Sequence, residues 1–162
     1  MEKKHNDKSF EEAIIKYGGI ITKICYYFAS DSEEFKDLRQ EVFYNIWKGL
    51  DNFRHDSKLS TWIYRISFNT CISFHRKEKK IVKIPITQIM EMPDDYQEAD
   101  KLEKYRAMQA LIRQLKYEER ALILMWLDEM SYEEISSLTG LNRNTVAVKL
   151  KRIKDKLVKM VD

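Results

Sequence analysis

The sequence predicts an all-α protein made of two small helical domains. Glycine and proline are scarce, with 4 and 2 residues in a chain of 162, so few residues interrupt a helix. Apolar residues recur at helical spacing along most of the chain, which is typical of amphipathic helices. This periodicity is lost at 79–101, where Pro85 and Pro93 prevent a helix from continuing. We therefore expect helical domains at 9–78 and 102–162, joined by a flexible linker at 79–101.

Three helices are expected in the first domain. Ser9 and Glu12 have the spacing of a capping box, so the first helix should begin at Ser9, and Gly18-Gly19 offers a point for a kink in it. Helical spacing of apolar residues predicts a second helix from about Glu33 to Leu50 and a third from Thr61 to about Glu78, with Ser60 opening it. The residues expected on the buried side of the third helix are Ile63, Ile66, Thr70 and Phe74.

The flanks of the third helix combine aromatic, cationic and amide side chains. These residues are Trp62, Tyr64, Arg65, Phe68 and Asn69, and the helix ends in the basic run 75–80. Aromatic rings among positive charges suit unpaired nucleic-acid bases, because the rings stack on bases while the cations follow the phosphate backbone. An ordinary aromatic core would show the same spacing, so both interpretations stay open for this helix.

The second domain ends in a pattern typical of a helix-turn-helix. Two helices precede it, one from Leu102 to Leu115 and one at about 117–130. Ser131 and Glu134 then have the spacing of a capping box, and Gly140 suits the left-handed turn that ends a short helix. A second helix follows at once, with an apolar stripe at helical spacing. The stripe consists of Val146, Leu150, Ile153 and Leu157.

The opposite face of this last helix is a candidate for reading DNA. It carries Asn144, Thr145, Val148, Lys151, Arg152 and Asp155. Lysines and arginines far outnumber aspartates from residue 143 onward, which favours contacts to several phosphates. A helix-turn-helix places its second helix in the major groove of DNA. The alternative is a helical hairpin whose charged face is only solvated.

Other classes of protein are not indicated. No apolar run approaches the roughly 20 residues of a membrane span, and the N-terminus lacks the apolar core of a signal peptide, so we expect a cytoplasmic protein without membrane insertion. Cys25 and Cys71 are far apart in sequence and are expected to be buried thiols. No HExxH, GxSxG, P-loop or GxGxxG string occurs. We therefore expect no catalytic residues, no metal site, no cofactor and no enzymatic activity.

Two blocks of sequence together resemble the extracytoplasmic-function (ECF) sigma factors, the small two-domain members of the bacterial sigma-70 family. The first block runs from Asp37 to Lys48 and continues from Phe53 to Thr70. The second runs from Leu127 to Gly140 and includes Asn144-Thr-Val146 with the basic helix after it. The resemblance covers nearly the whole chain. It implies a subunit that directs promoter recognition, DNA melting and transcription initiation, with core RNA polymerase, promoter DNA and an anti-sigma factor as partners.

The resemblance also implies which residues act, with the first domain similar to sigma region 2 and the second to region 4. Polymerase contacts fall on Asp37, Gln40 and Glu41. On the same helix Trp47 is expected to be mainly core. Contacts to the −10 element and to melted DNA, including capture of a flipped base by the loop 54–59, fall on Arg54, Asp56, Lys58, Trp62, Arg65 and Asn69. Contacts to the −35 element fall on Arg143, Asn144, Thr145, Val148, Lys149, Lys151 and Arg152, with Lys149 on phosphate.

Two residues depart from the family's pattern, and two other functions stay open. Ala147 and Val148 stand where the family commonly has a basic and a small polar residue, so we expect fewer hydrogen bonds and more methyl contacts to thymine. The first alternative is a conventional helix-turn-helix regulator that binds duplex DNA as a dimer without being a polymerase subunit. It calls for an obvious dimerisation helix, which the sequence does not show. The second is a helical adaptor whose basic faces bind protein.

Overall fold

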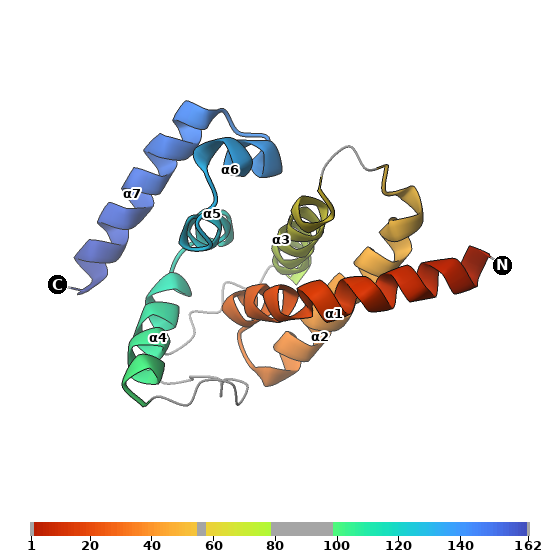
Figure 1. Cartoon of the computed structure of the whole chain (residues 1–162). Coiled ribbons are helices and arrows are strands. Elements are labelled where there is room, and N and C mark those ends of the chain that lie inside the picture. Colours follow the sequence, from red (N-terminus) through yellow and green to blue (C-terminus); the bar gives the residue numbers. More distant parts are fainter. Residues whose placement is uncertain (1, 55–57, 79–98, 162) are drawn as a thin grey trace. The chain divides into compact units, whose positions relative to one another are not determined.

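The computed structural model describes residues 2–54, 58–78 and 99–161 (Figure 1). Within these ranges the chain forms seven α-helices and one short 3-10 helix and contains no strand, so the all-α prediction is confirmed. The chain divides into two compact units, Met1–Lys80 and Ile81–Asp162. Most of the expected linker, residues 79–98, lies outside the described residues, while residues 99–101 are already helical. No proline or glycine follows Pro93 before Leu102, so nothing in the sequence delays this helix.

Three helices pack against one another in the first unit. They are α1 (Glu2–Phe28), α2 (Ser32–Gly49) and α3 (Leu59–Glu78), with the 3-10 helix η1 (Leu50–Asn52) directly after α2. Their shared core includes Ile21, Ile24, Phe28, Leu38, Val42, Ile46, Ile63 and Phe68. Both cysteines are buried free thiols in this core, as predicted.

The first helix begins earlier than predicted. It starts at Glu2, so Ser9 lies inside the helix instead of capping it, and that prediction is wrong. Residues 2–8 contain no glycine or proline, and the helix therefore extends upstream of the predicted cap. The helix also continues through Gly18 and Gly19, and the Thr22 hydroxyl donates to the Gly18 carbonyl at 2.8 Å.

Phe68 belongs to the core and not to the exposed flank in which its aromatic character placed it. It is buried, and its ring meets that of Phe28 edge-on with 6.1 Å between centroids. Among the four residues expected on the buried side of this helix, Ile63 and Thr70 are buried and the other two are half-buried. The buried face of α3 is wider than predicted, because both α1 and α2 pack against it.

His75, the first residue of the basic run 75–80, joins three helices. Its Nε2 lies 2.6 Å from the carbonyl oxygen of Phe28 at the end of α1, and 3.5 Å from Oε1 of Glu34 near the start of α2. The same carboxylate oxygen accepts hydrogen bonds from the backbone N–H and the hydroxyl of Ser30, at 3.1 and 3.2 Å. The buried imidazole thus engages a carbonyl group that the end of α1 leaves without a helical partner.

Four helices form the second unit, and the last of them contacts the other three. They are α4 (Ala99–Ile112), α5 (Tyr117–Leu127), α6 (Tyr132–Thr139) and α7 (Arg143–Val161). The buried Arg120 donates from Nη2 to the carbonyl oxygens of Arg113 and Leu115, at 2.6 and 3.0 Å, which fastens the turn between α4 and α5. The core of the unit includes Ile112, Leu115, Leu122, Ile123, Ile135, Leu138, Val146, Leu150 and Ile153.

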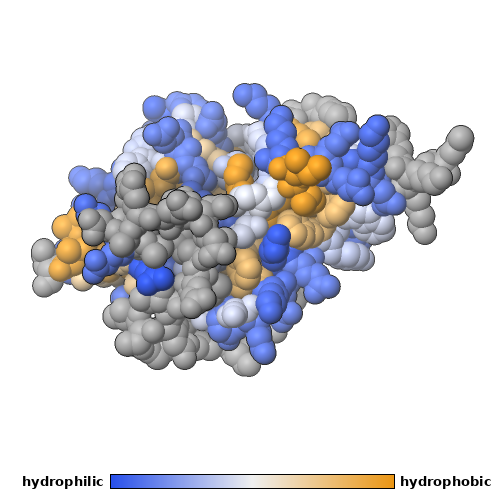
Figure 2. All heavy atoms as spheres, turned by 60° about the horizontal axis from the view of Figure 1, so that its bottom comes forward, coloured by the Kyte–Doolittle hydropathy of each residue, from blue (hydrophilic) through white to orange (hydrophobic). Residues whose placement is uncertain are grey.

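Apolar patches lie between hydrophilic side chains on the face of the protein shown in Figure 2. Large apolar residues that are exposed include Ile15, Tyr44, Met108, Val148, Val158 and Val161. Among the described helices, none combines the length and apolar character needed to cross a membrane. Within the same ranges, no three side chains of His, Cys, Asp or Glu are grouped so that they could hold a metal ion.

Candidate nucleic-acid interface

Local hydrogen bonds fix the helix-turn-helix formed by α6 and α7. The hydroxyl of Ser131 accepts from the N–H of Glu134 at 3.1 Å, and the Glu134 carboxylate accepts from the N–H of Ser131 at 3.2 Å, so the predicted capping box is confirmed. Gly140 has a φ of 76°, the left-handed conformation that glycine adopts without strain, and it ends α6 as predicted. The side-chain oxygen of Asn142 then accepts from the N–H of Asn144 at 2.8 Å and caps the first turn of α7.

The outer face of α7 gathers most of the predicted −35 contacts on one helix. Its inner face buries Val146, Leu150 and Ile153. Thr145 is half-buried at the border between the two faces, and Val148 is 50% exposed. The exposed members of the predicted set are Arg143, Asn144, Val148, Lys149, Lys151 and Arg152. A helix with this division can place polar, cationic and methyl groups in a major groove while its apolar side stays packed.

Arg143 differs from the other predicted −35 residues because it is engaged with α6. Its Nε lies 2.5 Å from Oε1 of Glu133, and its guanidinium lies 6.0 Å from the centroid of the Tyr132 ring. A hydrogen bond from the backbone N–H of Glu133, followed by the charge and hydrogen bond of Arg143, lowers the pKa of Glu133 against the opposing effect of desolvation. A phosphate that approaches Arg143 must therefore compete with the Glu133 carboxylate, in an ion pair that is exposed to solvent.

Two other cations of α7 face the protein. Nζ of Lys156 lies 3.2 Å from Oε1 of Glu119 in α5, and Nζ of Lys154 lies 3.8 Å from the centroid of the Trp126 ring in the same helix. Both lysines were among the cations predicted to favour phosphate contacts. Because they contact α5, fewer cations of α7 are available to phosphate than predicted. Periodicity could not show this, because the partner of Lys156 lies 37 residues away in the chain.

The predicted −10 contacts lie around the start of α3. Arg54 and Lys58 are exposed on either side of residues 55–57, and Asp56 therefore lies outside the described residues. Asn69 is exposed further along α3, and Arg65 is half-buried. The structure thus brings two cations to the loop ends and leaves an amide exposed along the helix that follows.

Trp62 is half-buried and packs against the end of α2. Its ring centroid lies 5.2 Å from that of Phe53, with 43° between the ring planes. The α-carbon of Gly49 lies close to the outer edge of the indole. Trp62 therefore helps to hold the first unit together, and its remaining exposed surface is what a base could reach.

The predicted polymerase contacts lie on the outer face of α2. Asp37, Gln40 and Glu41 are all exposed. Tyr44 lies on the same face at helical spacing and is 54% exposed, and its ring centroid is 6.3 Å from that of the half-buried Trp47. Tyr44 is not among the predicted contacts, although it follows Asp37 by seven residues, a spacing that places both on one face of a helix.

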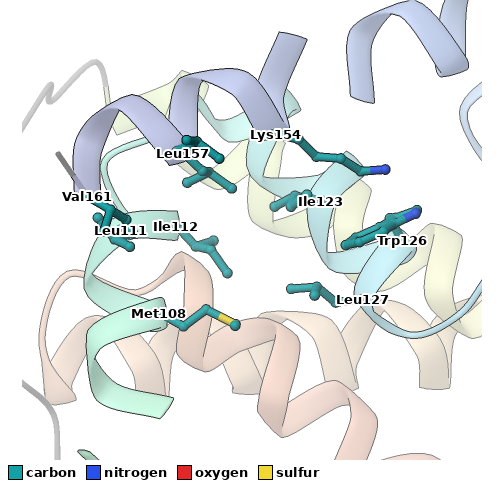
Figure 3. A pocket seen from close by; sticks show the side chains of 10 residues that line it. Met108, Leu111, Ile112, Ile123, Trp126, Leu127, Lys154, Leu157 and Val161 are labelled. Atoms are coloured by element: carbon teal, nitrogen blue, oxygen red, sulfur yellow. The ribbon is translucent and has the colours of Figure 1, made fainter. Parts of the chain in front are cut away.

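An apolar groove of about 280 Å³ lies between α4, α5 and α7 (Figure 3). Side chains from the three helices line it: Met108, Leu111, Ile112, Ile123, Trp126, Leu127, Lys154, Leu157, Val158 and Val161. Val158 is 61% exposed at this groove. Because the lining is almost entirely apolar, the groove suits an apolar side chain and offers little to a phosphate.

Family models and relatives agree with this arrangement. Residues 14–81 match Sigma-70 region 2, and residues 105–157 match Sigma-70, region 4. The RNA polymerase sigma factor YlaC of Bacillus subtilis is 30% identical over 167 residues, which cover 96% of this chain and 93% of that protein. The ECF RNA polymerase sigma factor SigW of the same organism is 27% identical over 174 residues, which cover 98% of this chain and 92% of that protein.

Solved structures share the fold at lower sequence identity. CnrH, in complex with the cytosolic domain of CnrY, has a TM-score of 0.69 and 22% identity and covers 99% of this chain and 92% of its own. The sigma factor RpoE of Bartonella quintana, in complex with the anti-sigma factor NepR, has a TM-score of 0.73 and 20% identity and covers 95% and 97%. A match to both sigma regions in order is not expected of a dimeric regulator or an adaptor. The chain belongs to the sigma-70 family as an extracytoplasmic-function RNA polymerase sigma factor.

Proposed function

We propose that this sigma factor performs its role in promoter recognition, DNA melting and initiation through three exposed surfaces. The outer face of α7 contacts the −35 element, the start of α3 with the loop ends before it contacts the −10 element, and the outer face of α2 contacts core RNA polymerase. The observation that carries the assignment to DNA is α7 itself. Its polar and cationic residues lie opposite a buried stripe, directly after a capped turn.

At the −35 element, Asn144, Lys151 and Arg152 reach base edges, and Lys149 contacts phosphate. Val148 and Ala147 add methyl contacts to thymine, because neither has a hydrogen-bonding group. Arg143 contributes less than its charge implies, since Glu133 holds its guanidinium. Half-buried Thr145 contributes at the border of this face.

At the −10 element, Arg54, Asp56 and Lys58 contact the strand that carries the flipped base, and Arg65 and Asn69 contact the DNA that has melted. Extruding one base costs a few kcal/mol of stacking and pairing. Stacking of a base on an aromatic ring returns about 1–3 kcal/mol, so the exposed part of Trp62 and two loop cations are enough to offset one extruded base.

The protein contributes no catalysis of its own, needs no metal or cofactor, and acts in the cytoplasm with core polymerase. Asp37, Gln40 and Glu41 form the polymerase contact on α2, with Tyr44 next to them on the same face. Residues 9–78 act as the sigma region 2 domain, residues 79–101 as the linker and residues 102–162 as the sigma region 4 domain.

An anti-sigma factor regulates this protein by covering part of these surfaces. CnrH and RpoE, which share its fold, were solved with CnrY and with the anti-sigma factor NepR. The apolar groove between α4, α5 and α7 is a protein contact, because its lining does not suit DNA. A charged residue at the groove, as in Val158→Glu, weakens binding of a protein partner and leaves −35 binding intact. Val148→Glu makes the same substitution on the outer face of α7. It weakens −35 binding and leaves binding of the protein partner intact.

The test of the proposed function uses the full chain with core polymerase. We expect stable association with the core enzyme, selection of one promoter class by the holoenzyme from random DNA, and permanganate-reactive thymines at the −10 element. Asp37→Arg with Glu41→Arg should reduce association with the core enzyme. Tight sequence-specific binding to duplex DNA with no polymerase association would overturn the proposal.

A further inference from the structure

Gly49, at the end of α2, differs from the other helical glycines in what lies next to its α-carbon. Its φ of −85° and ψ of −15° are helical, so the backbone does not require glycine here. A β-carbon at this position would lie 2.8 Å from Cζ2 and 3.3 Å from Cη2 of Trp62. At Gly19 nothing lies within 4 Å of the same point, and at Gly18 the nearest atom is 3.7 Å away. Gly49 is therefore the glycine that makes room for the Trp62 indole.

From this position Trp62 contacts both ends of the loop between η1 and α3. Its ring packs on that of Phe53, which directly precedes Arg54. Its backbone N–H donates to the carbonyl oxygen of Lys58 at 3.1 Å. Arg54 and Lys58 are the exposed cations at these two ends. Trp62 therefore connects the chain next to Arg54, through its ring contact with Phe53, with Lys58 at the first turn of α3, through its backbone.

We propose that Gly49 is a positioning residue for the −10 surface: by leaving space for Trp62 it holds Arg54 and Lys58 where they meet promoter DNA. The inference rests on the proposed function of that surface. A methyl group at position 49 must displace either the rigid indole or the end of α2, since packed carbon atoms do not approach to 2.8 Å. Either displacement moves the two loop ends.

The first experiment compares Gly49→Ala with Gly19→Ala in the full chain bound to core polymerase. Both variants replace a helical glycine by alanine, but only the first introduces a clash. We expect Gly49→Ala to lower the rate of open-complex formation by about 10- to 100-fold, as for a displaced contact group. Its affinity for core polymerase and its binding to a −35 element should stay within about twofold. Gly19→Ala should change none of the three quantities, including the rate of open-complex formation.

The second experiment removes the clash from the other side. Phenylalanine lacks the atoms of Trp62 that a methyl group at position 49 would meet, so Gly49→Ala should be harmless in a Trp62→Phe background. The double variant should then form open complexes as fast as Trp62→Phe alone. Effects that multiply across the two changes would overturn the proposal, as would a folded Gly49→Ala variant with unchanged open-complex formation. If Gly49→Ala alone does not fold, the comparison in the Trp62→Phe background decides.

Two further variants separate this inference from the proposed function. Arg54→Ala and Lys58→Ala should each slow open-complex formation if the surface contacts the −10 element. If neither has an effect, the proposed function of the surface is wrong. If both slow the reaction and Gly49→Ala does not, only the role of Gly49 is wrong.

Discussion

Asn69 and Trp62 lie on the same helix but have different surroundings. Asn69 is exposed, so we expect Asn69→Ala to change the free energy of unfolding by no more than about 0.5 kcal/mol. If its amide contacts melted DNA, the variant should form open complexes slowly on a duplex promoter and nearly normally on a promoter already melted at the −10 element. Thermal denaturation and open-complex kinetics measure the two effects. A folded variant that premelted DNA does not rescue would exclude this role.

Arg152 and Lys156 lie one turn apart on α7 and should behave differently. Arg152 is exposed on the outer face, and Arg152→Ala should weaken −35 binding by about 1–3 kcal/mol and relax preference at one base pair. Lys156 pairs with Glu119, so Lys156→Ala should leave DNA binding nearly unchanged and lower stability by about 0–1 kcal/mol. Titrations of a holoenzyme on single-base variants distinguish them. Equal, sequence-independent losses would mean that both residues contact only phosphate.

In a helix or at its end, the sign of φ at a glycine determines whether its replacement by alanine lowers or raises the free energy of unfolding. Gly140 has a φ of 76°, so Gly140→Ala should lower the free energy of unfolding of the second unit by about 1 kcal/mol. Gly19 is helical and exposed, so Gly19→Ala should raise that of the first unit by up to about 1 kcal/mol. Chemical denaturation followed by circular dichroism measures both changes in the free energy of unfolding. If the two changes have the same sign, the conformations given for the two glycines do not determine the effect of alanine.

Elements that depend on neighbours in sequence could be predicted, and those that depend on distant partners could not. The capping box of Ser131 and the turn at Gly140 follow from contacts a few residues apart, so the sequence predicted them. The predicted start of α1 at Ser9 was wrong. No helix-breaking residue precedes Ser9, and a residue suited to cap a helix does not by itself prevent the helix from extending upstream. The space that Gly49 leaves for Trp62 and the pairing of Lys156 with Glu119 depend on how helices pack, which one-dimensional periodicity does not contain.

The two surfaces proposed to contact DNA lie on separate units of the protein. Each surface offers few contacts, so we expect the chain alone to bind promoter duplex weakly and the holoenzyme to bind it at least about 100-fold more tightly, because core polymerase fixes both units and raises their effective concentration. Electrophoretic mobility shifts with and without core enzyme measure the ratio. Equal affinities in the two experiments would show that one unit is sufficient.

The ion pair between Arg143 and Glu133 also limits how strongly the DNA affinity of the isolated second unit depends on salt concentration. Each phosphate neutralised on duplex DNA releases counterions and adds about −0.9 to the slope of log K against log salt. Arg143, Lys154 and Lys156 contact groups of the same unit, so the other exposed cations of α7 are Lys149, Lys151, Arg152 and Lys159. A slope no steeper than about −4 is therefore expected. Glu133→Gln removes the ion pair with Arg143. If Arg143 then contacts one more phosphate, the slope should become more negative by about 0.9.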